Sequence, residues 1–444
     1  MEEQQEEKFG RRVLWGVTFA VIGVAILAII VGPAILTSPA RPPVVKIYYA
    51  DNISPAHQEI VRRFNERYRN RYQVITVHLP FTRFSTNERK ELLARALRSK
   101  SDRIDVFSVD VIWVPRFAKW GEPLDAYFTH ADRARLLPYA LTSCYYQGRL
   151  MAVPLYLDIG LMYYRKDLLQ QLPDWPALQE KVQRSISWEE FLAAFERWSP
   201  KTSPYYLFAA DNYEGLICSF VEGVMSLGDS LVDAEGRIRV NTPAARRSLQ
   251  LLADLVHRYR ATPPKVVFFD EILSYMYALD HNAIFFRGWP GFLLHYREQI
   301  ERTAPLSNFG LAPLPHFAGG RPAFVFGGWN LMISRFSRNG RAALTFVRFL
   351  LEEQNQKILY ETSGYIPVLQ SIYADTSFLA AHPDLSLYRR LMEHGVHRPY
   401  IERYTQVSDI LSYYANLAIR GEMSVAEALE KAQAAIFSNQ FVLK

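Results

Sequence analysis

The sequence predicts an α/β protein whose body has two lobes joined by three chain crossings, with one N-terminal transmembrane helix in front of it. Three observations predict this architecture. Residues 13–36 are apolar and uncharged, strands alternate with helices from residue 44 onward, and proline-marked breaks interrupt three apolar segments. A chain of 444 residues is also too long for one small core, so we expect roughly two to four compact units.

The N-terminal apolar run, residues 13–36, is long enough to span a bilayer with some tilt. Lys8, Arg11 and Arg12 precede it, and the positive-inside rule then places residues 1–12 in the cytoplasm. We therefore expect a single-pass protein of the cell membrane, held in the lipid bilayer by residues 13–36, with a periplasmic or extracellular main body.

A cleaved signal peptide is the alternative for this segment. Residues 38–40 are Ser-Pro-Ala, small enough for a peptidase to cut, but the apolar run is longer than that of a signal peptide. We favour a retained anchor, followed by a tether over residues 37–43. No cysteine lies near the segment, so we expect no lipid anchor on cysteine.

Strands and helices alternate in the first part of the body. Apolar runs predict strands at residues 44–49, 74–79 and 104–109, and apolar stripes at helical spacing predict a helix after each of the first two. This alternation is typical of a parallel sheet covered on both faces. Ligands of such sheets bind at the carboxyl ends of the strands, which points to the loop that contains Asn52, and to Asp110.

Three breaks at proline divide the body. Pro154 interrupts an apolar run, and because a central strand rejects proline, we expect the chain to leave one sheet for another there. Pro313 and Pro367 mark two similar breaks. Three crossings would make both lobes discontinuous and would let them close about a hinge. The expected lobes are residues 44–153 with 314–365, and residues 154–313 with 366–444.

Helix-start signals are frequent in the second half of the body. Ser187 and Ser424 each begin a capping box, and Thr242 precedes a proline at the first helical position. The last helix is expected to end near Phe437. These signals describe the fold and carry no chemistry.

Three acidic side chains are candidates for ligand contacts. Asp110 follows a strand, where a helix cap is its alternative role. Asp158 lies in an apolar run that offers no local partner, so we expect it to face a cleft or else to form an internal salt bridge. Glu214 lies beside a glycine before an apolar helix, where it could accept a hydroxyl hydrogen bond or serve as an ordinary helix-start residue.

Aromatic rings, a glycine and an arginine accompany these acids. Trp289 is held between a glycine and a proline, and is either a stacking platform or a loop anchored in the core. Tyr213 could stack in the same way. Gly328 precedes Trp329 and would permit close approach of a ligand, or only a tight turn. Arg398 could donate paired hydrogen bonds to hydroxyls or to a carboxylate.

Acids, an arginine and tryptophan rings on loops together suit a sugar. Its hydroxyls need charged or amide partners, and the C–H faces of its rings need a flat apolar surface. The aromatic share of 14% agrees with a cleft lined by rings, and equally with an aromatic-rich core.

Composition and motifs argue against several other classes. A hydrophobic share of 49% and a charged share of 22% are those of an ordinary globular protein. The net charge of +6 is spread along the chain, so no nucleic-acid partner is expected. No spacing suggests a metal site, and no cofactor is expected. Cys144 and Cys218 could form one disulfide in an oxidising compartment or remain two buried thiols.

The candidate residues lie in a series of segments whose order and spacing are distinctive together. The segments are residues 105–125, 148–169, 213–216, 287–290, 327–331 and 398–408. In these segments the chain resembles the carbohydrate-binding family of extracellular solute-binding proteins of ABC importers, and within it the trehalose/maltose-binding branch. The resemblance extends from about residue 44 to residue 437.

This resemblance implies the type II periplasmic-binding-protein fold, in which two α/β lobes close over a sugar. It further implies docking on the transmembrane subunits of an ABC permease, whose cytoplasmic ATPases drive import, by a protein that is monomeric apart from the transporter. The residues that the resemblance places against the sugar are Asp110, Asp158, Glu214, Trp289, Gly328, Trp329 and Arg398. Two features depart from the family: a lipobox cysteine is absent, and the loop at Asn52 has no residue-by-residue match.

Two other functions remain open from the sequence. A glycoside hydrolase would use Asp110 and Asp158 as a carboxylate pair roughly 5–10 Å apart. A scaffold or sensor would keep the fold with a degenerate cleft, for which the unmatched first loop is the indication. We predict a receptor and not an enzyme, whose ligand is a disaccharide such as trehalose or maltose, or a short oligosaccharide.

Overall fold

The chain divides into two compact units, Met1–Val45 and Lys46–Lys444. The computed structural model describes residues 9–10, 13–27, 43–80, 86–100, 103–172, 174–198 and 203–438. In the first unit, residues 9–10 and 13–27 are helical. Among the described residues, no helix combines the length and the apolar character that crossing a membrane requires.

Several expectations for the N-terminal part fall on residues that are not described. These are residues 28–36 of the expected anchor, residues 37–42 of the expected tether, and residues 1–8 and 11–12 of the expected cytoplasmic segment. The transmembrane helix expected over residues 13–36 is therefore not confirmed.

The larger unit contains a six-stranded sheet. Its strands are β1 (Val45–Asp51), β2 (Tyr72–His78), β3 (Val106–Asp110), β6 (Val153–Ile159), β11 (Phe324–Ile333) and β12 (Gly395–Val396). The order is β12-β11-β3-β1-β2, and β6 also pairs with β11. β1 is parallel to β3 as the alternation predicts, whereas β11 is antiparallel to both β3 and β6. We call this sheet and its helices the first lobe.

Helices of the first lobe bury one apolar stripe each against this sheet or against one another. They are α2 (Pro55–Arg67), α3 (Thr86–Arg98), α15 (Gly340–Leu350) and α16 (Glu353–Ser363). Ser54 caps α2 by accepting a hydrogen bond from the His57 amide, and Phe64 of α2 packs edge-on against Phe346 with ring centroids 5.1 Å apart. Burying such a ring contributes on the order of 2 kcal/mol.

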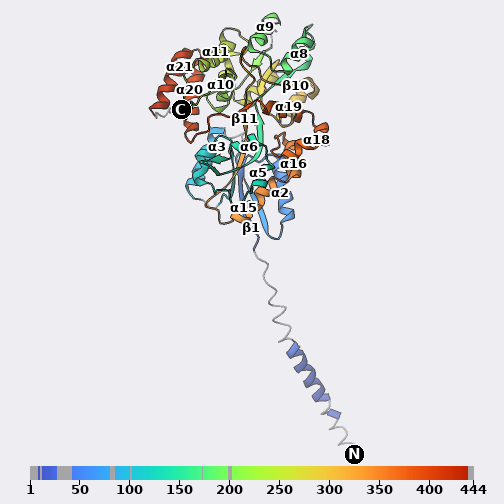
Figure 1. The fold of residues 1–444 in the computed structure, drawn as a ribbon. Helices are drawn as coiled ribbons and strands as arrows, with labels where there is room; N and C mark the ends of the chain where they lie inside the picture. The colour runs from blue at the N-terminus through green and yellow to red at the C-terminus, as the bar shows by residue number, and fades with distance from the viewer. Residues whose placement is uncertain are drawn as a thin grey trace, which may run out of the picture. The chain divides into compact units, whose positions relative to one another are not determined.

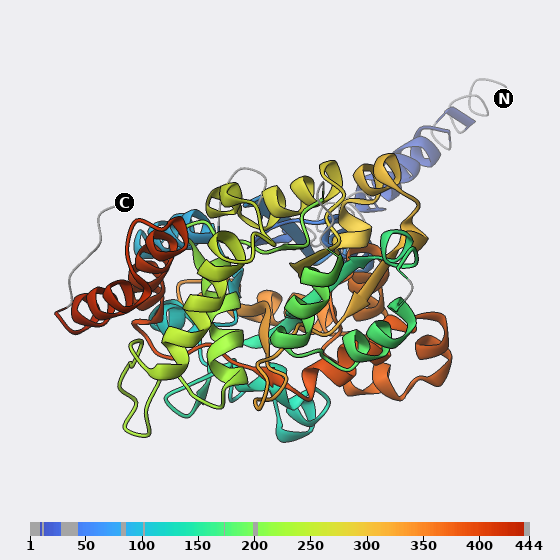
Figure 2. The same cartoon turned by 90° about the horizontal axis from the view of Figure 1, so that it is seen from above.

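A four-stranded sheet forms the second lobe. Its strands are β7 (Leu161–Arg165), β8 (Tyr206–Leu207), β9 (Phe285–Gly288) and β10 (Phe309–Ala312), in the order β10-β7-β9-β8. The longer helices around it are α8 (Trp175–Gln183), α9 (Trp188–Trp198), α10 (Glu214–Ser226), α11 (Pro243–His257), α12 (Glu271–Asp280), α20 (Tyr404–Arg420) and α21 (Val425–Phe437). The two lobes occupy opposite ends of the larger unit (Figure 1), and α20 and α21 lie beside α10 and α11 (Figure 2).

Short elements connect these parts. They are α4 (Val114–Phe117), η1 (Ala118–Trp120), α5 (His130–Ala134), α6 (Pro138–Thr142), β4 (Tyr145–Tyr146), β5 (Arg149–Leu150), α7 (Lys166–Leu169), η2 (Pro264–Phe268), α13 (Phe292–His295), α14 (Arg297–Thr303), η3 (Leu306–Asn308), α17 (Gln370–Ala374), α18 (Thr376–Ala381) and α19 (Asp384–Met392).

The helix-start signals largely hold. Ser187 Oγ accepts from the Glu190 amide at 3.2 Å and donates to the Glu190 carboxylate at 2.9 Å, so the Glu190 side chain returns to Ser187 through its hydroxyl. Ser424 accepts from the amide of Glu427, but the Glu427 side chain pairs with Lys431 at 2.8 Å, so only half of that box forms.

Aromatic residues build much of the core of the second lobe. Phe191 lies 4.7 Å from Tyr205 and 4.9 Å from Phe285, measured between ring centroids. All three side chains are fully buried. Much of the aromatic content therefore serves packing, which is one of the two explanations that composition left open.

The chain passes from the first sheet to the second at Gly160, between β6 and β7. The Gly160 amide donates to the Val325 carbonyl at 3.0 Å. A Cβ atom at this position would collide with Oε1 of Glu222 and lie 3.1 Å from Nη2 of Arg287. Glycine is therefore required here because a buried ion pair fills the space that a side chain would take.

The crossing expected at Pro154 is wrong. Pro154 lies inside β6 and pairs with Asn330, where the register between β6 and β11 shifts after Trp329. Among the described residues, β11 is the only named strand that pairs with β6, and an isolated bridge joins Leu157 to Ile366 on the other side. β6 is thus an edge strand with a bulge opposite its proline. Proline has no backbone N–H to donate, and neither an edge position nor a bulge requires that donor. The chain therefore continues in the same sheet.

The two later breaks differ from each other. Between Ala312 of β10 and Phe324 of β11 the chain returns to the first sheet, in the region of Pro313. After Pro367 the chain still contacts the first lobe, because the Leu137 amide donates to the Val368 carbonyl at 2.8 Å. The exact limits of the two lobes stay a prediction.

Both cysteines are buried free thiols, so the alternative of a disulfide does not apply. Cys144 precedes β4 in the first lobe, and Cys218 lies in α10 of the second lobe. Burial raises the pKa of both thiols, that of Cys218 to about 12.

Candidate ligand-binding site

Arg398 joins two of the predicted acids across the two lobes. Its Nη1 lies 2.7 Å from Glu214 Oε1, and its Nη2 lies 3.1 Å from Asp110 Oδ1. Nη2 also lies within hydrogen-bond distance, 3.3 Å, of the Phe326 carbonyl. Asp110 ends β3 in the first lobe, Glu214 begins α10 in the second, and the arginine side chain is 2% exposed. The sequence-predicted residues Asp110, Glu214 and Arg398 therefore form one buried ion-pair cluster.

The carboxylate of Glu214 is held mainly by protein groups. Besides Arg398, it accepts a hydrogen bond from the Tyr404 hydroxyl at 2.7 Å and another from Ser408 Oγ. Burial raises the pKa of Glu214, while the Arg398 charge opposes that shift. The geometry gives Glu214 a part in fixing Arg398, and it lies in the first turn of α10 as the helix-start alternative expected.

Asp110 makes a local contact as well. Its Oδ1 accepts from the Ile112 amide at 3.1 Å, in addition to the contact with Arg398. The Ile112 amide belongs to the turn before α4, and the N-cap of α4 is Trp113 without a side-chain cap, so Asp110 does not cap this helix as its alternative role expected. In the register of the sheet, Asp110 lies opposite Trp329 of β11, which brings a third predicted residue to the same place.

Asp158 differs from the other acids because its half-buried carboxylate makes no hydrogen bond or ion pair with any residue that the structure describes. Burial raises its pKa well above the ordinary aspartate value, and the nearby Asp110 charge raises it further. The internal salt bridge that the sequence left open does not form. The group therefore retains acceptor capacity for a partner from outside the protein.

Trp289 lies close to Asp158. A Cβ atom at Gly327 would be 3.2 Å from the Asp158 Cβ and 3.1 Å from Cζ3 of Trp289, so both side chains pass over this glycine. The loop is held because the Trp289 carbonyl accepts from the Tyr163 hydroxyl at 2.8 Å. Since the indole is half-buried, Trp289 is neither a free surface ring nor a fully enclosed core residue.

Gly328 is required by the backbone of the sheet itself. Its φ is +118°, and a Cβ atom there would lie 2.5 Å from the Tyr156 carbonyl oxygen and 2.8 Å from the Leu157 Cα. Close packing of β11 on β6 explains this glycine. The next residue, Trp329, is 6% exposed and meets Trp113 at nearly a right angle with centroids 5.4 Å apart.

Tyr213 is buried beside Glu271. A Cβ atom at Gly215 would collide with the Tyr213 hydroxyl, so the ring fits only because that position is glycine. Burial raises the pKa of Tyr213, and the Glu271 carboxylate adds to the shift. Nε1 of Trp289 lies 3.3 Å from the same carboxylate, so Tyr213 and Trp289 both lie near Glu271.

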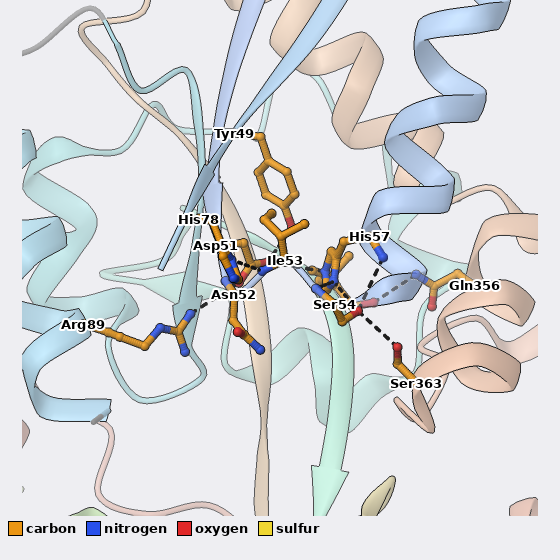
Figure 3. A network of polar contacts seen from close by, with 11 residues as sticks. Tyr49, Asp51, Asn52, Ile53, Ser54, His57, His78, Arg89, Gln356 and Ser363 are labelled. Carbon is orange, nitrogen blue, oxygen red and sulfur yellow. Dashed lines mark hydrogen bonds and ion pairs between the residues drawn. The ribbon is translucent and has the colours of Figure 1, made fainter. Parts of the chain in front are cut away.

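The first loop is built around Asp51, a buried acid at the end of β1, to which the rule for the carboxyl ends of strands pointed together with Asn52. Asp51 accepts from the Tyr49 hydroxyl at 2.5 Å and from the Asn52 amide at 2.6 Å. Figure 3 shows Arg89 and His57 on opposite sides of this carboxylate, each at 3.5 Å. Asn52 itself is half-buried beside the network.

Arg89 is the functional candidate that the sequence did not reveal. It lies in a polar stretch of α3 that looks like a solvated helix face, yet its side chain is 2% exposed. Its guanidinium carbon is 4.2 Å from the centroid of the Trp329 ring. Only the fold brings α3 against β11, so no local signal could have identified this contact.

Comparison with known families and proteins agrees with this arrangement. A family model described as bacterial extracellular solute-binding protein matches residues 59–386. A protein of Deinococcus radiodurans named probable ABC transporter-binding protein is 30% identical over 347 residues, which cover 76% of this chain and 80% of that protein.

Solved structures are similar over most of the chain. The maltose-bound MalE3 of T. maritima aligns with a TM-score of 0.79 and 26% identity, covering 89% of this chain and 100% of that one. The GacH receptor of Streptomyces glaucescens aligns with a TM-score of 0.75 and 23% identity, covering 89% of this chain and 98% of that one. The two-lobe fold is therefore shared, and the expectation of this fold is confirmed.

Proposed function

Because the chain belongs to the bacterial extracellular solute-binding proteins, and is thus a binding protein and not an enzyme, we propose that it captures a sugar between its two lobes. The ligand would be a disaccharide such as trehalose or maltose, or a short oligosaccharide. The observation that carries the proposal is Asp158, a half-buried carboxylate left without a protein partner among the described residues and flanked by a half-buried tryptophan.

A sugar meets both needs of this place. Its hydroxyl groups would donate to Asp158 and to the remaining acceptor positions of Asp110. These hydrogen bonds would offset the desolvation free energy of the two buried acids. The Trp289 ring offers a flat apolar surface to the C–H face of a sugar ring, and Trp329 would contribute a second ring. A stacked ring is worth on the order of 1 kcal/mol beyond the area that it buries.

Charge at the site supports a neutral ligand. Arg398 is shared by two acids, Arg89 is paired with Asp51, and Asp158 adds an acid with no cation beside it. A negatively charged sugar would be repelled here, since like charges in a partly buried site are costly. The maltose bound by the T. maritima protein, a neutral sugar, is consistent with this preference.

We further propose that the protein delivers its ligand to the transmembrane subunits of an ABC permease, as the name of the Deinococcus radiodurans relative suggests for that protein. The body would act outside the cytoplasm, with residues 13–36 as its membrane anchor. Fractionation of cells that express the full chain tests the anchor. Recovery in the membrane fraction, lost when residues 1–43 are deleted, is expected; release of the full chain as a shorter soluble form would instead indicate cleavage.

Calorimetric titration of the purified body with a panel of neutral disaccharides and oligosaccharides tests the sugar proposal. We expect saturable binding of at least one sugar, and a loss of at least tenfold in affinity in Asp158→Asn. Asp280→Asn is the matched control, because Asp280 is an exposed aspartate at the end of α12. Absence of binding across the whole panel would exclude a sugar receptor and favour the scaffold alternative.

A further inference from the structure

Two tryptophans, one on each lobe, share an arrangement that the proposed function does not use. Each indole has an arginine guanidinium over one face, and each arginine is paired with a buried acid. In the first lobe the residues are Trp329, Arg89 and Asp51; in the second they are Trp289, Arg287 and Glu222.

The distances in the two sets are close. The guanidinium carbon lies 4.2 Å from the Trp329 centroid in one case and 4.4 Å from the Trp289 centroid in the other. Both arginine side chains are 2% exposed. At such distances a cation and an indole attract each other strongly because water is largely excluded.

The acids that hold the arginines are themselves braced. Arg287 lies 2.8 and 2.9 Å from the two oxygens of Glu222, and Glu222 also accepts from the Val325 amide at 3.2 Å. Asp51 is braced by the Tyr49 hydroxyl and by the Asn52 amide. In the first lobe the three residues come from α3, β1 and β11, and in the second from β9, α10 and the residue after β9, so no shared local sequence produces the likeness.

Stability alone does not explain why two arginine–acid ion pairs are buried here. A buried ion pair contributes little relative to apolar residues of similar volume, because desolvation offsets the attraction. Such a pair occurs twice in this protein, each time against a tryptophan ring of the site. Conformational specificity explains this better than stability does. In each case the arginine occupies one face of the ring and so holds the ring in one orientation.

We propose that Arg89 and Arg287 are positioning residues that fix the Trp329 and Trp289 rings for ligand stacking, and that Asp51 and Glu222 hold these arginines in place. The inference rests on the proposed function for its ligand, but it makes a claim about the free protein too. It also assigns a role to the first loop: Asp51 and its neighbours act on the ligand through Arg89 and Trp329, without touching it.

The test uses the protein labelled with fluorotryptophan, in which Trp329→Phe and Trp289→Phe assign the two fluorine resonances. We expect Arg89→Met to shift or broaden the Trp329 resonance in the free protein, and Arg287→Met to do the same for Trp289. Arg89→Lys, which keeps the charge, should largely restore the signal. Asp51→Asn keeps Arg89 but removes the charge that pairs with it, so it should change the Trp329 resonance in the same direction as Arg89→Met.

Affinity for maltose and trehalose is measured on the same variants. A weakening of about fivefold or more is expected in Arg89→Met, with partial recovery in Arg89→Lys. Arg247→Met is the matched control, since Arg247 lies over Phe317 at 4.7 Å and pairs with Glu189 on the protein surface. That control should leave both fluorine resonances and both affinities unchanged.

The two proposals fail in different ways. If the unmodified protein binds neither these sugars nor others, the proposed function fails, while the fluorine spectra still decide whether the arginines fix the rings. If the unmodified protein binds sugar and the arginine variants keep either their ring signals or their affinity, the positioning role is overturned. A misfolded Arg89→Met is replaced by Arg89→Lys and Asp51→Asn, whose unchanged spectra would overturn it equally.

Discussion

At the scale of single residues, stability and binding oppose each other at Asp158. Its half-buried carboxylate has no partner among the described residues, and burial together with the Asp110 charge raises its pKa. An acid whose pKa is raised in the folded state loses stability as the pH rises from the ordinary aspartate value through the raised one. The free protein therefore bears a cost at neutral pH that a ligand can remove.

Replacing this acid should reveal the cost. Asp158→Asn is expected to stabilise the ligand-free protein by about 1 kcal/mol at neutral pH, because no charge is then buried without a partner. The gain should disappear below the ordinary pKa of aspartate, where the group is protonated in both states. Denaturant unfolding at several pH values measures the effect, and an equal gain at every pH would contradict this explanation.

Ligand binding should itself depend on pH through the same group. Since ligand hydroxyls donate best to the ionised carboxylate, affinity is expected to fall as the pH is lowered through the raised pKa of Asp158. Binding should also release protons within this range, which calorimetry in two buffers of different ionisation enthalpy detects. Asp158→Asn should abolish the buffer difference, whereas Asp280→Asn should preserve it.

Gly328 offers a test of backbone constraint at the site. Gly328→Ala should destabilise the protein by about 2 kcal/mol or more, because φ is +118° and the new Cβ would lie 2.5 Å from the Tyr156 carbonyl. Gly340→Ala is the control, since nothing lies within 4 Å of a Cβ atom there. Equal unfolding midpoints for the two variants would show that β6 and β11 can separate at little cost.

At the scale of elements, the sequence predicted strand and helix identity better than the connections. The alternation of strands and helices around β1, β2 and β3 is a local sequence pattern, and so is the capping signal at Ser187. Both were therefore predicted from the sequence. The crossing predicted at Pro154 was wrong because the edge position of β6 depends on its pairing with β11, which is far away in the sequence. Arg89 was missed for the same reason: its burial depends on a strand more than two hundred residues later.

The connection between β6 and β7 can be tested at Gly160. Gly160→Ala should displace the Glu222 carboxylate from Arg287 and cost about 3 kcal/mol, as expected when a buried ion pair is broken. Because Arg287 lies over Trp289, the tryptophan emission of the folded variant should change too. A stable variant with unchanged emission would mean that the ion pair can be accommodated elsewhere.

At the scale of the whole molecule, the two lobes contact each other directly. α3 of the first lobe meets α20 of the second, where Asp409 accepts from Asn87 at 2.9 Å and lies 3.5 Å from the Lys90 ammonium. Near this contact Arg116 donates to Thr405 at 2.8 Å. These contacts stabilise a closed arrangement of the lobes, and a larger closed population would raise the apparent affinity for the ligand.

Asp409→Ala should shift that equilibrium. The buried Lys90 would lose its ion pair with Asp409, so the open arrangement should gain population and the apparent affinity for ligand should fall severalfold. Small-angle scattering of the ligand-free body should show a larger radius of gyration. Glu430→Ala, an exposed acid on α21, is the control, and identical scattering of the two variants would contradict a role for Asp409 in closure.

The reactivity of the two buried thiols reports local opening of the protein. Cys144 belongs to the first lobe and Cys218 to the second, and burial raises the pKa of both, so neither reacts while its surroundings stay folded. A thiol reagent added to the native protein will therefore be consumed only as fast as each lobe exposes its cysteine. Mass spectrometry of the two peptides would then time the opening of each lobe separately, without any engineered label.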